Sequence, residues 1–161
     1  MYDELVRLGY TNIIVVGTSF GGYMAALLAA QRLIYTLVLR AAANYADDEL
    51  ELPYTKTREV REHSTPIYRQ DLPKTFTNRA LDAVRQFDGQ TYVIEHEADE
   101  VIHASIPRSY FAAARHGNYM VIPKLTHSPR SMPNPEAYFA LVEFWIAAIV
   151  RGTRAASEAT G

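Results

Sequence analysis

Short apolar runs alternate with longer stretches in which apolar residues recur at helical spacing. The runs have the length and β-branched or aromatic content of strands, and they fall at 11–16, 35–41, 90–95 and 118–123. The helical spacing predicts helices over 2–8, 20–32, 77–87, 105–116 and from 134 to about 150. Strand and helix thus alternate four times. This pattern predicts an α/β three-layer sandwich, in which helices flank a parallel sheet of about four strands.

Two stretches fall outside this alternation. Residues 44–76 are polar, contain three prolines and mix acidic with basic side chains. They are interpreted either as a solvated connection or as a lid over a functional site. Residues 151–161 are small and polar, which predicts a disordered tail, so the predicted domain covers 1–150. Thr77 and Asn134 are the expected caps of the helices that follow them.

Composition narrows the functional classes. The chain has 161 residues, 48% of them hydrophobic and 21% charged, which suits one globular domain. The net charge of −2 gives no reason to expect nucleic acid or an anionic membrane as a partner. There is no cysteine, and no apolar run is long enough to span a bilayer. The first residues are acidic and helical, unlike a signal peptide, so we expect a cytoplasmic protein.

The stretch 17–22 is the strongest candidate for chemistry. Ser19 stands between Gly17, at the end of an apolar strand, and the pair Gly21-Gly22, at the start of an alanine-rich helix. Little side chain fits where a strand end and a helix start nearly touch, so positions 17 and 21 should be small. Ser19 should adopt a strained backbone conformation that lifts its hydroxyl clear of the sheet. Free N–H groups of the helix favour developing negative charge there, which suits a nucleophile.

A glycine-rich turn between a strand and a helix is also typical of phosphate-binding and dinucleotide-binding sites. A P-loop requires Gly-Lys-Ser/Thr, and no lysine is present here. The dinucleotide pattern G-x-G-x-x-G fails at Ser19, and no acidic residue ends the next strand at 37–41. The sequence also contains no Tyr-x-x-x-Lys. A nucleophile is therefore favoured, with phosphate binding as the weaker alternative.

A serine needs a base to take its proton and a third group to hold that base. The turn after the third strand, EHEADE at 95–100, is rich in acids, and the turn after the fourth carries His127. Both turns lie at carboxyl ends of strands in the same predicted sheet as Ser19, where ligands of such sheets bind. The order along the chain is serine, acid, histidine.

This order, together with Gly-x-Ser-x-Gly-Gly after an apolar strand, resembles the α/β-hydrolase superfamily. The segment VIEHEADEVI resembles the strand and acid turn of that family and selects Asp99. The segment VIPKLTHS resembles its final strand and histidine loop and selects His127. The elbow GTSFGGYMA is most similar to the dienelactone-hydrolase and prolyl-oligopeptidase-like branch. The resemblance covers residues 2–150.

The resemblance implies a serine hydrolase without a cofactor that cleaves a small-molecule carboxylic ester, or less readily a peptide or thioester bond. Ser19 would attack the acyl carbonyl, His127 would transfer the proton, and Asp99 would orient the imidazole. The backbone N–H of Phe20 would form half of an oxyanion hole, because it begins the helix beside the nucleophile.

The remaining acids of the turn, Glu95, Glu97 and Glu100, are interpreted as a solvated acidic surface, with Glu97 as a fallback for the triad acid. The other histidines are interpreted as surface or supporting residues: His63, His96, His103 and His116. Two of them lie near the predicted acid and raise the question of a metal ion, but their spacing is not specific and we predict no metal.

The sequence departs from the family pattern in two respects. It places His96 where the family usually has glycine, and it contains only the C-terminal part of the fold. The family's second oxyanion donor follows an earlier strand, and loss of one such donor costs about a hundred- to a thousandfold in turnover. The strand ending at Val16 would also be an exposed apolar edge, which predicts a homo-oligomer. The alternative function is therefore a catalytically impaired hydrolase-fold fragment that acts as a binding module or belongs to a longer chain.

Overall fold

The structure, a computed structural model, describes residues 1–49, 51, 53, 56, 65–128, 130 and 132–160, with the backbone alone for 153–160. In chain order its elements are α1 (Tyr2–Arg7), β1 (Ile14–Thr18), α2 (Phe20–Ala29), β2 (Thr36–Arg40), η1 (Ile67–Arg69), α4 (Arg79–Gln86), β3 (Gln90–His96), α5 (Ser105–Ala113), β4 (Gly117–Ile122) and α6 (Pro135–Thr160). The predicted alternation of strand and helix is confirmed.

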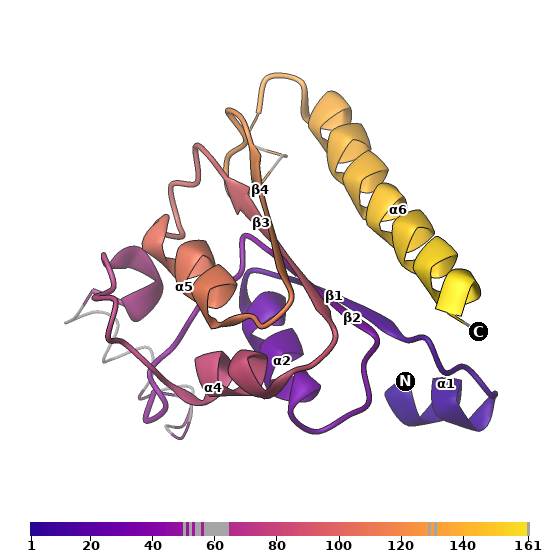
Figure 1. The fold of residues 1–161 in the computed structure, drawn as a ribbon. Coiled ribbons are helices and arrows are strands. Elements are labelled where there is room, and N and C mark those ends of the chain that lie inside the picture. Colours follow the sequence, from indigo (N-terminus) through magenta and orange to yellow (C-terminus); the bar gives the residue numbers. More distant parts are fainter. Residues whose placement is uncertain are drawn as a thin grey trace.

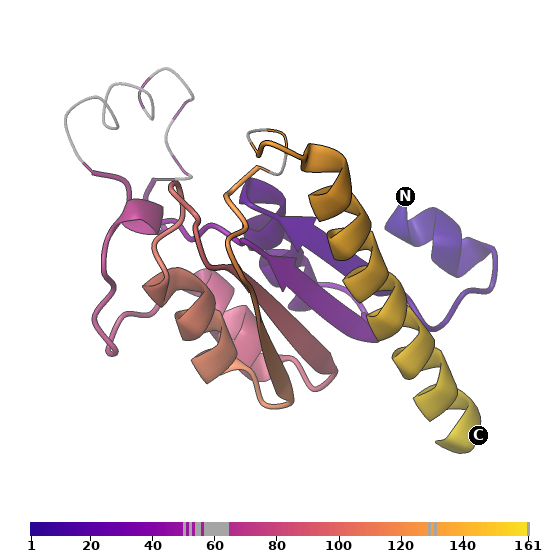
Figure 2. The same ribbon diagram turned by 90° about the horizontal axis from the view of Figure 1, so that it is seen from above.

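The four strands form one parallel sheet in the order β1-β2-β3-β4. The order never reverses, so right-handed crossovers place α2, α4 and α5 on the same face. Among the helices that the structure describes, α6, which follows the last strand, is the one that covers the opposite face (Figures 1 and 2). The predicted three-layer α/β architecture is therefore confirmed, and all four strands end at the same edge of the sheet.

Alternate side chains along each strand enter two separate cores. On the α2, α4 and α5 side, Leu37, Leu39 and Val93 are completely buried. On the α6 side, the buried residues include Val38 and Ile94. Residues 36–39 of β2 are inaccessible to solvent, as expected for a parallel strand that is covered on both faces.

Several predicted element ends are corrected by side-chain contacts and by packing. The first strand begins at Ile14 and includes the elbow residues as far as Thr18. Asn78, and not Thr77, caps α4, since its Oδ1 accepts the Leu81 N–H at 3.0 Å. Asn134 acts as predicted at the start of α6, where its Oδ1 accepts a backbone N–H three residues later at 3.3 Å.

The backbone of α6 is helical as far as Thr160, so the described helix runs into the stretch from Arg151 for which the sequence predicts a disordered tail. Its last turns are rich in alanine, the residue with the highest helix propensity, and they contain no proline. None of the helices in the described part of the chain is long and apolar enough to cross a lipid bilayer.

The segment 44–76 is described in part. Its beginning, Asn44 and Tyr45, is buried beside α4, where the Asn78 amide donates to the Asn44 Oδ1 and to the Tyr45 carbonyl. Its end, from residue 65, packs near the start of α5, where Ser105 Oγ accepts the Leu72 N–H at 2.9 Å. His63 lies outside the described residues.

Candidate active site

Ser19 occupies the turn between β1 and α2 in a strained conformation, with φ 53° and ψ −125°. Its N–H donates to the Arg40 carbonyl at 3.2 Å, and its carbonyl accepts from Gly22 and Ala43 at 2.9 and 3.0 Å. Neighbouring β2 therefore holds the nucleophile candidate in a backbone region that costs a non-glycine residue about 1–3 kcal/mol. The strained turn predicted for Ser19 is present.

The glycines of this turn have different roles. A Cβ added at Gly17 would lie 2.4 Å from the Gly21 carbonyl oxygen and 2.7 Å from the Ala25 Cβ. A Cβ added at Gly22 would lie 2.5 Å from the Ala42 Cβ, whereas one at Gly21 would meet nothing within 4 Å. The prediction that position 21 must be small is therefore wrong. Gly21 presents its carbonyl oxygen to the strand, and Gly22 is the residue that allows α2 to approach the chain after β2.

The side chains of Ser19, His127 and Asp99 form a continuous hydrogen-bonded line at the carboxyl ends of β1, β4 and β3. His127 Nε2 lies 3.0 Å from Ser19 Oγ, and His127 Nδ1 lies 3.0 Å from Asp99 Oδ2. The imidazole is 17% exposed and the carboxylate 5% exposed. The structure thus brings together the three residues that the sequence motifs select, although up to 108 positions separate them in the chain.

Asp99 is held as a buried carboxylate. Its Oδ1 accepts the N–H groups of Val101 and Ile102 at 2.9 and 2.8 Å. Burial acts to raise the pKa of Asp99, but the hydrogen bonds from His127 and from the two backbone groups outweigh it, so the pKa lies below its ordinary value. A carboxylate at this position can only accept, so His127 carries its proton on Nδ1. Its Nε2 is then free to accept the hydroxyl proton of Ser19.

No protein-family model matches the chain, and no curated protein sequence matches it. Solved structures do. A monoacylglycerol lipase from Paleococcus ferrophilus aligns with a TM-score of 0.58 and 12% identity, over 91% of this chain and 72% of its own. MGS-MChE2, an α/β hydrolase from the metagenome of lagoon sediments at Mar Chica, Morocco, aligns with a TM-score of 0.56 and 19% identity, over 91% and 66%. The chain has the α/β-hydrolase fold.

Another structure with this fold is the esterase domain of a Rhodothermus marinus protein, with a TM-score of 0.54, 14% identity, and coverage of 78% of this chain and 57% of that domain. Across these three structures, this chain spans between 57% and 72% of the length of its counterpart. At identities of 12–19%, these likenesses establish the α/β-hydrolase fold. They do not establish the activity, because one fold serves many functions.

The N–H of Phe20, the oxyanion donor expected from the sequence, belongs to the residue directly after Ser19. Phe20 is the first residue of α2, and none of the described residues accepts a hydrogen bond from its N–H. Its side chain is half exposed and meets the Tyr45 ring edge-on, with the ring centroids 5.7 Å apart. Tyr45 in turn contacts Tyr68, so the described parts of segment 44–76 supply an aromatic wall beside the candidate nucleophile.

Two acids of the predicted solvated turn are exposed, as expected, and also hold the loop that carries His127. Glu100 Oε2 accepts the His127 N–H at 3.0 Å, and Glu97 Oε2 accepts the Lys124 N–H at 2.8 Å. Asp99, and not the fallback Glu97, takes the imidazole. The sequence contained no signal for the role of Glu100, because its partner is a backbone group 27 residues away.

Glu95 corrects the prediction of a solvated acidic surface, which holds for the exposed Glu97 and Glu100. It is only 5% exposed, and it accepts hydrogen bonds from the Tyr119 hydroxyl and from two nitrogens of Arg108, both at 3.3 Å. Glu95 lies within β3, and the period of two along the strand points its side chain to the same side as that of Val93, toward α5.

The histidines outside the triad lie in different surroundings. His96 is buried, and its Nδ1 lies 2.7 Å from the Thr126 carbonyl oxygen. His103 Nδ1 lies 2.9 Å from Ser105 Oγ, and His116 is exposed. Within the described ranges, no three His, Cys, Asp or Glu side chains are grouped so that they could hold a metal ion.

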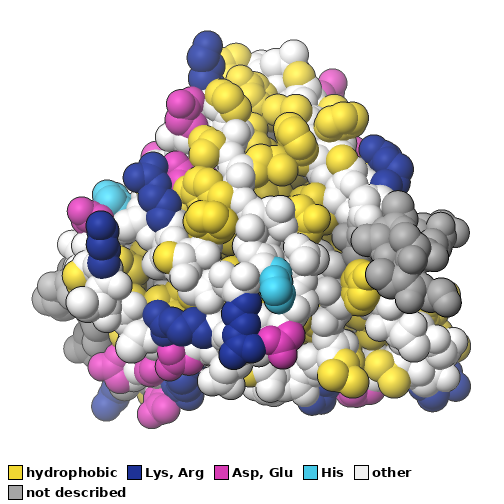
Figure 3. All heavy atoms as spheres, in the orientation of Figure 1, with side chains coloured by type: hydrophobic (Ala, Val, Ile, Leu, Met, Phe, Trp, Pro, Cys, Tyr) yellow, Lys and Arg dark blue, Asp and Glu magenta, His cyan; other side chains and the backbone are white. Residues whose placement is uncertain are grey.

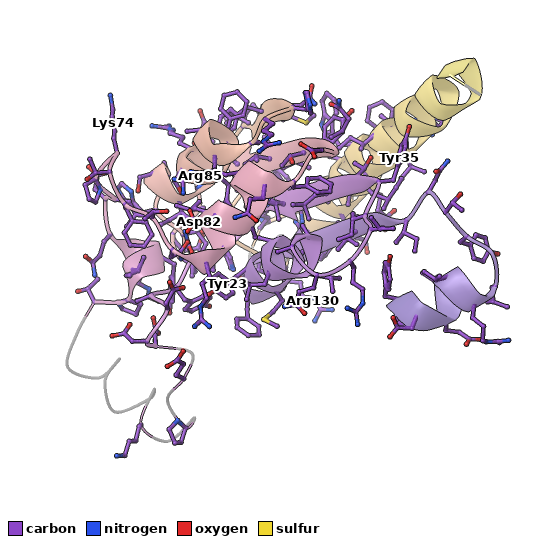
Figure 4. All side chains as sticks on the ribbon, turned by 60° about the horizontal axis from the view of Figure 1, so that its bottom comes forward. Tyr23, Tyr35, Lys74, Asp82, Arg85 and Arg130 are labelled. Atoms are coloured by element: carbon purple, nitrogen blue, oxygen red, sulfur yellow. The ribbon has the colours of Figure 1, made fainter. Side chains whose placement is uncertain are left out.

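A cavity of about 600 Å³ lies apart from the triad, between α4, α5 and the loop 71–76. Its lining includes Phe76, Arg85 and Arg108 but none of the triad residues. Two of its basic side chains already have carboxylate partners, since Arg85 pairs with Asp82 and Arg108 with Glu95. Figure 4 shows Asp82 and Arg85 together on α4, while Lys74 projects away from them on its loop.

Proposed function

We propose that Ser19, His127 and Asp99 form a catalytic triad that hydrolyses a carboxylic ester through an acyl-serine intermediate. The observation that carries the proposal is the unbroken line from Ser19 Oγ to His127 Nε2 and from His127 Nδ1 to Asp99, each step 3.0 Å long, with Ser19 in the strained elbow conformation. A structural serine needs neither the strain nor the buried imidazole–carboxylate pair.

In the first half-reaction, Ser19 Oγ attacks the ester carbonyl carbon while His127 Nε2 takes the hydroxyl proton. The tetrahedral intermediate then collapses, its bond to the alcohol oxygen breaks, and His127 returns the proton to the leaving alcohol. In the second half-reaction, a water attacks the acyl-serine and gives its proton to His127. Release of the acid returns that proton to Ser19 Oγ. Asp99 stays ionised and stabilises the imidazolium in both steps.

The Phe20 N–H is proposed as one oxyanion donor, because it begins the helix beside Ser19 and has no acceptor among the described residues. The aromatic wall formed by Phe20 and Tyr45 favours an apolar group on the substrate, and segment 44–76 is proposed to shape that side of the site. The elbow sequence favours the dienelactone-hydrolase and prolyl-oligopeptidase-like branch. Peptide and thioester bonds are the less favoured substrates.

The test is labelling with a fluorophosphonate probe, which phosphonylates an activated serine. We expect the chain to be labelled and the Ser19→Ala and His127→Ala variants not to be. Ser109→Ala is the matched control, since Ser109 Oγ donates only within its own helix, to the Ile106 carbonyl. Labelling of the control at the normal rate excludes a general effect of serine replacement. A folded chain that is not labelled, or labelling that survives in Ser19→Ala, contradicts the proposal.

A second candidate function, a binding module that pairs with a second copy of this chain, is favoured by the open edge of the sheet. β1 is an edge strand, and its Val16 is 43% exposed. Exposed apolar side chains on α6 are Phe139, Leu141, Phe144 and Val150. Figure 3 shows hydrophobic side chains gathered over the upper part of the face seen in Figure 1, where α6 and the strands beside it lie. Such edges and patches are typical of surfaces that associate.

Sedimentation velocity tests this second function. We expect a dimer that Val16→Lys converts to a monomer. Val121→Lys is the matched control, because Val121 is also 43% exposed but lies on β4 at the other edge of the sheet. A wild-type chain that is monomeric over the whole concentration range contradicts pairing through β1.

A further inference from the structure

His96 is a buried titratable residue that the proposed reaction does not use. It is 2% exposed, at the carboxyl end of β3. Its Nδ1 lies 2.7 Å from the Thr126 carbonyl oxygen, and its Nε2 lies 3.4 Å from Arg40 Nη1. Arg40 Nε in turn donates to Thr18 Oγ1 at 3.2 Å. Four residues therefore form one chain of hydrogen bonds across β1, β2, β3 and the loop after β4.

The donors and acceptors of this chain have only one consistent arrangement. A carbonyl can only accept, so His96 carries its proton on Nδ1. A guanidinium can only donate, so His96 Nε2 must be unprotonated to receive Arg40. The imidazole is therefore neutral. In agreement with this, burial lowers the pKa of His96 to about 4 and outweighs the hydrogen bond to Thr126, which raises the pKa; the neighbouring charge of Arg40 adds a smaller lowering.

The two ends of this series of hydrogen bonds, Thr18 and Thr126, adjoin the two reacting side chains of the proposed triad. Thr18 immediately precedes Ser19, and Thr126 immediately precedes His127. Thr18 and Arg40 are also direct partners in the β1–β2 register. Strand period places Thr18, Arg40 and His96 on the α6 face, beyond the apolar residues that fill that core. At the carboxyl ends of the strands, the polar side chains of Thr18, Arg40 and His96 therefore take the place of apolar packing beneath the site.

We propose that Arg40 and His96 are positioning residues that fix the separation between Ser19 and His127. This inference rests on the proposed function, because the distance matters for rate only if the serine reacts. The hydrogen bond from His96 holds the backbone carbonyl of the residue before the base. The hydrogen bond from Arg40 holds the side-chain hydroxyl of Thr18, the residue before the nucleophile. Burial lowers the pKa of Arg40, but the carboxylate of Asp99 opposes this and helps to keep the guanidinium charged.

Two variants each remove a different hydrogen bond of the series from Thr18 to Thr126. Thr18→Val removes the acceptor of Arg40 without changing side-chain shape. His96→Asn keeps a donor near the Thr126 carbonyl but removes the acceptor of Arg40 Nη1. Thr36→Val is the matched control for the first, since the Thr36 Oγ1 is buried without a hydrogen-bond partner among the described residues. His116→Asn, at an exposed histidine, is the matched control for the second.

The first readout is the second-order rate constant of fluorophosphonate labelling, measured with circular dichroism to show that each variant is folded. We expect Thr18→Val and His96→Asn each to lower the rate by roughly ten- to a hundredfold, because a displacement of about 1 Å at a reacting centre costs about that much. Both controls should label at the wild-type rate. The double variant should lose no more than the more damaged single variant, because both substitutions break the same chain.

The second readout does not depend on activity. The Nδ1–H proton of His127, hydrogen-bonded to Asp99, is expected to give a strongly downfield NMR resonance that disappears in His127→Gln. The inference requires this resonance to shift in Thr18→Val, because a displaced Ser19 Oγ changes the hydrogen bond to Nε2 of the same imidazole. If the wild-type chain is not labelled at all, the proposed function fails, and this resonance alone decides the positioning role. Normal labelling and an unchanged resonance in Thr18→Val overturn the inference, whether or not His96→Asn folds.

Discussion

Replacing each of the two adjacent glycines of α2, Gly21 and Gly22, separately by alanine tests how closely this helix approaches the residues after β2. Gly22→Ala adds a Cβ 2.5 Å from the Ala42 Cβ and 2.9 Å from its Cα. Gly21→Ala adds the same atom one position earlier, where nothing lies within 4 Å. Both substitutions exchange glycine for alanine in the first turns of the same helix, so the gain in helix propensity, up to about 1 kcal/mol, is common to both.

The difference between the two variants therefore measures the steric cost alone. Carbon atoms that are not bonded to each other pack at about 3.5–4.0 Å, so Gly22→Ala must move α2 and Ala42 apart by about 1 Å. Overpacking of this kind costs about 1–3 kcal/mol. For a domain of this size, each 1 kcal/mol changes the melting temperature by about 2–4 °C, so we expect Gly22→Ala to melt roughly 2–12 °C below Gly21→Ala.

Urea unfolding followed by circular dichroism gives the free energies, and fluorophosphonate labelling gives the consequence for the site. Phe20 and Ser19 lie on the same turn as Gly22, so the displaced helix should also slow labelling in Gly22→Ala. Gly21→Ala should label normally and be at least as stable as the wild-type chain. Equal stability of the two variants would refute the close contact between α2 and Ala42 and the reasoning that depends on it.

Three further predictions concern the triad and its supports. Asp99→Asn should leave the fold intact but lower the labelling rate at neutral pH by about four orders of magnitude, because the imidazole loses the carboxylate that selects its tautomer; a loss below tenfold would contradict this. Glu100→Ala, which removes the acceptor of the His127 N–H, should slow labelling about tenfold, while Glu100→Gln, which keeps an acceptor oxygen, should retain most of the rate. Burial lowers the pKa of His96 to about 4 from the ordinary 6.5. Between these values the unfolded chain binds a proton that the folded chain does not, so the contribution of His96 to stability is complete above pH 6.5 and falls by up to about 3 kcal/mol as the pH drops to 4. Urea unfolding at pH 7 and pH 4.5 should show a smaller loss in His96→Asn than in the wild-type chain, and an equal loss would refute the buried neutral imidazole.

The order and type of the elements could be predicted from the sequence because hydrophobic period is a local property. The apolar run over 35–41 has the pattern of a strand buried on both faces, and the structure shows β2 in that position. The candidate triad could also be selected, because each member lies in a short motif directly after a strand. Since parallel strands end at a common edge, the topology alone predicted that Ser19, Asp99 and His127 would be near one another.

The predictions that were wrong concern contacts between segments far apart in the chain. The free space beside Gly21 and the contact of Gly22 with Ala42 depend on how α2 lies against the end of β2. The burial of Glu95 depends on Arg108 and Tyr119. No local pattern encodes such distances.

The sequence by itself therefore determined the alternation and the layers, since these follow from local period. It also determined the three candidate reacting residues, since their motifs at strand ends resemble those of the α/β-hydrolase superfamily. Tertiary structure alone decided which of the glycines at positions 21 and 22 must be small and which polar residues lie beneath the site. The chain from Thr18 through Arg40 and His96 to the Thr126 carbonyl joins four segments that are brought together only when the sheet assembles. Its residues have no common motif, and their relation exists only as distances in the folded protein.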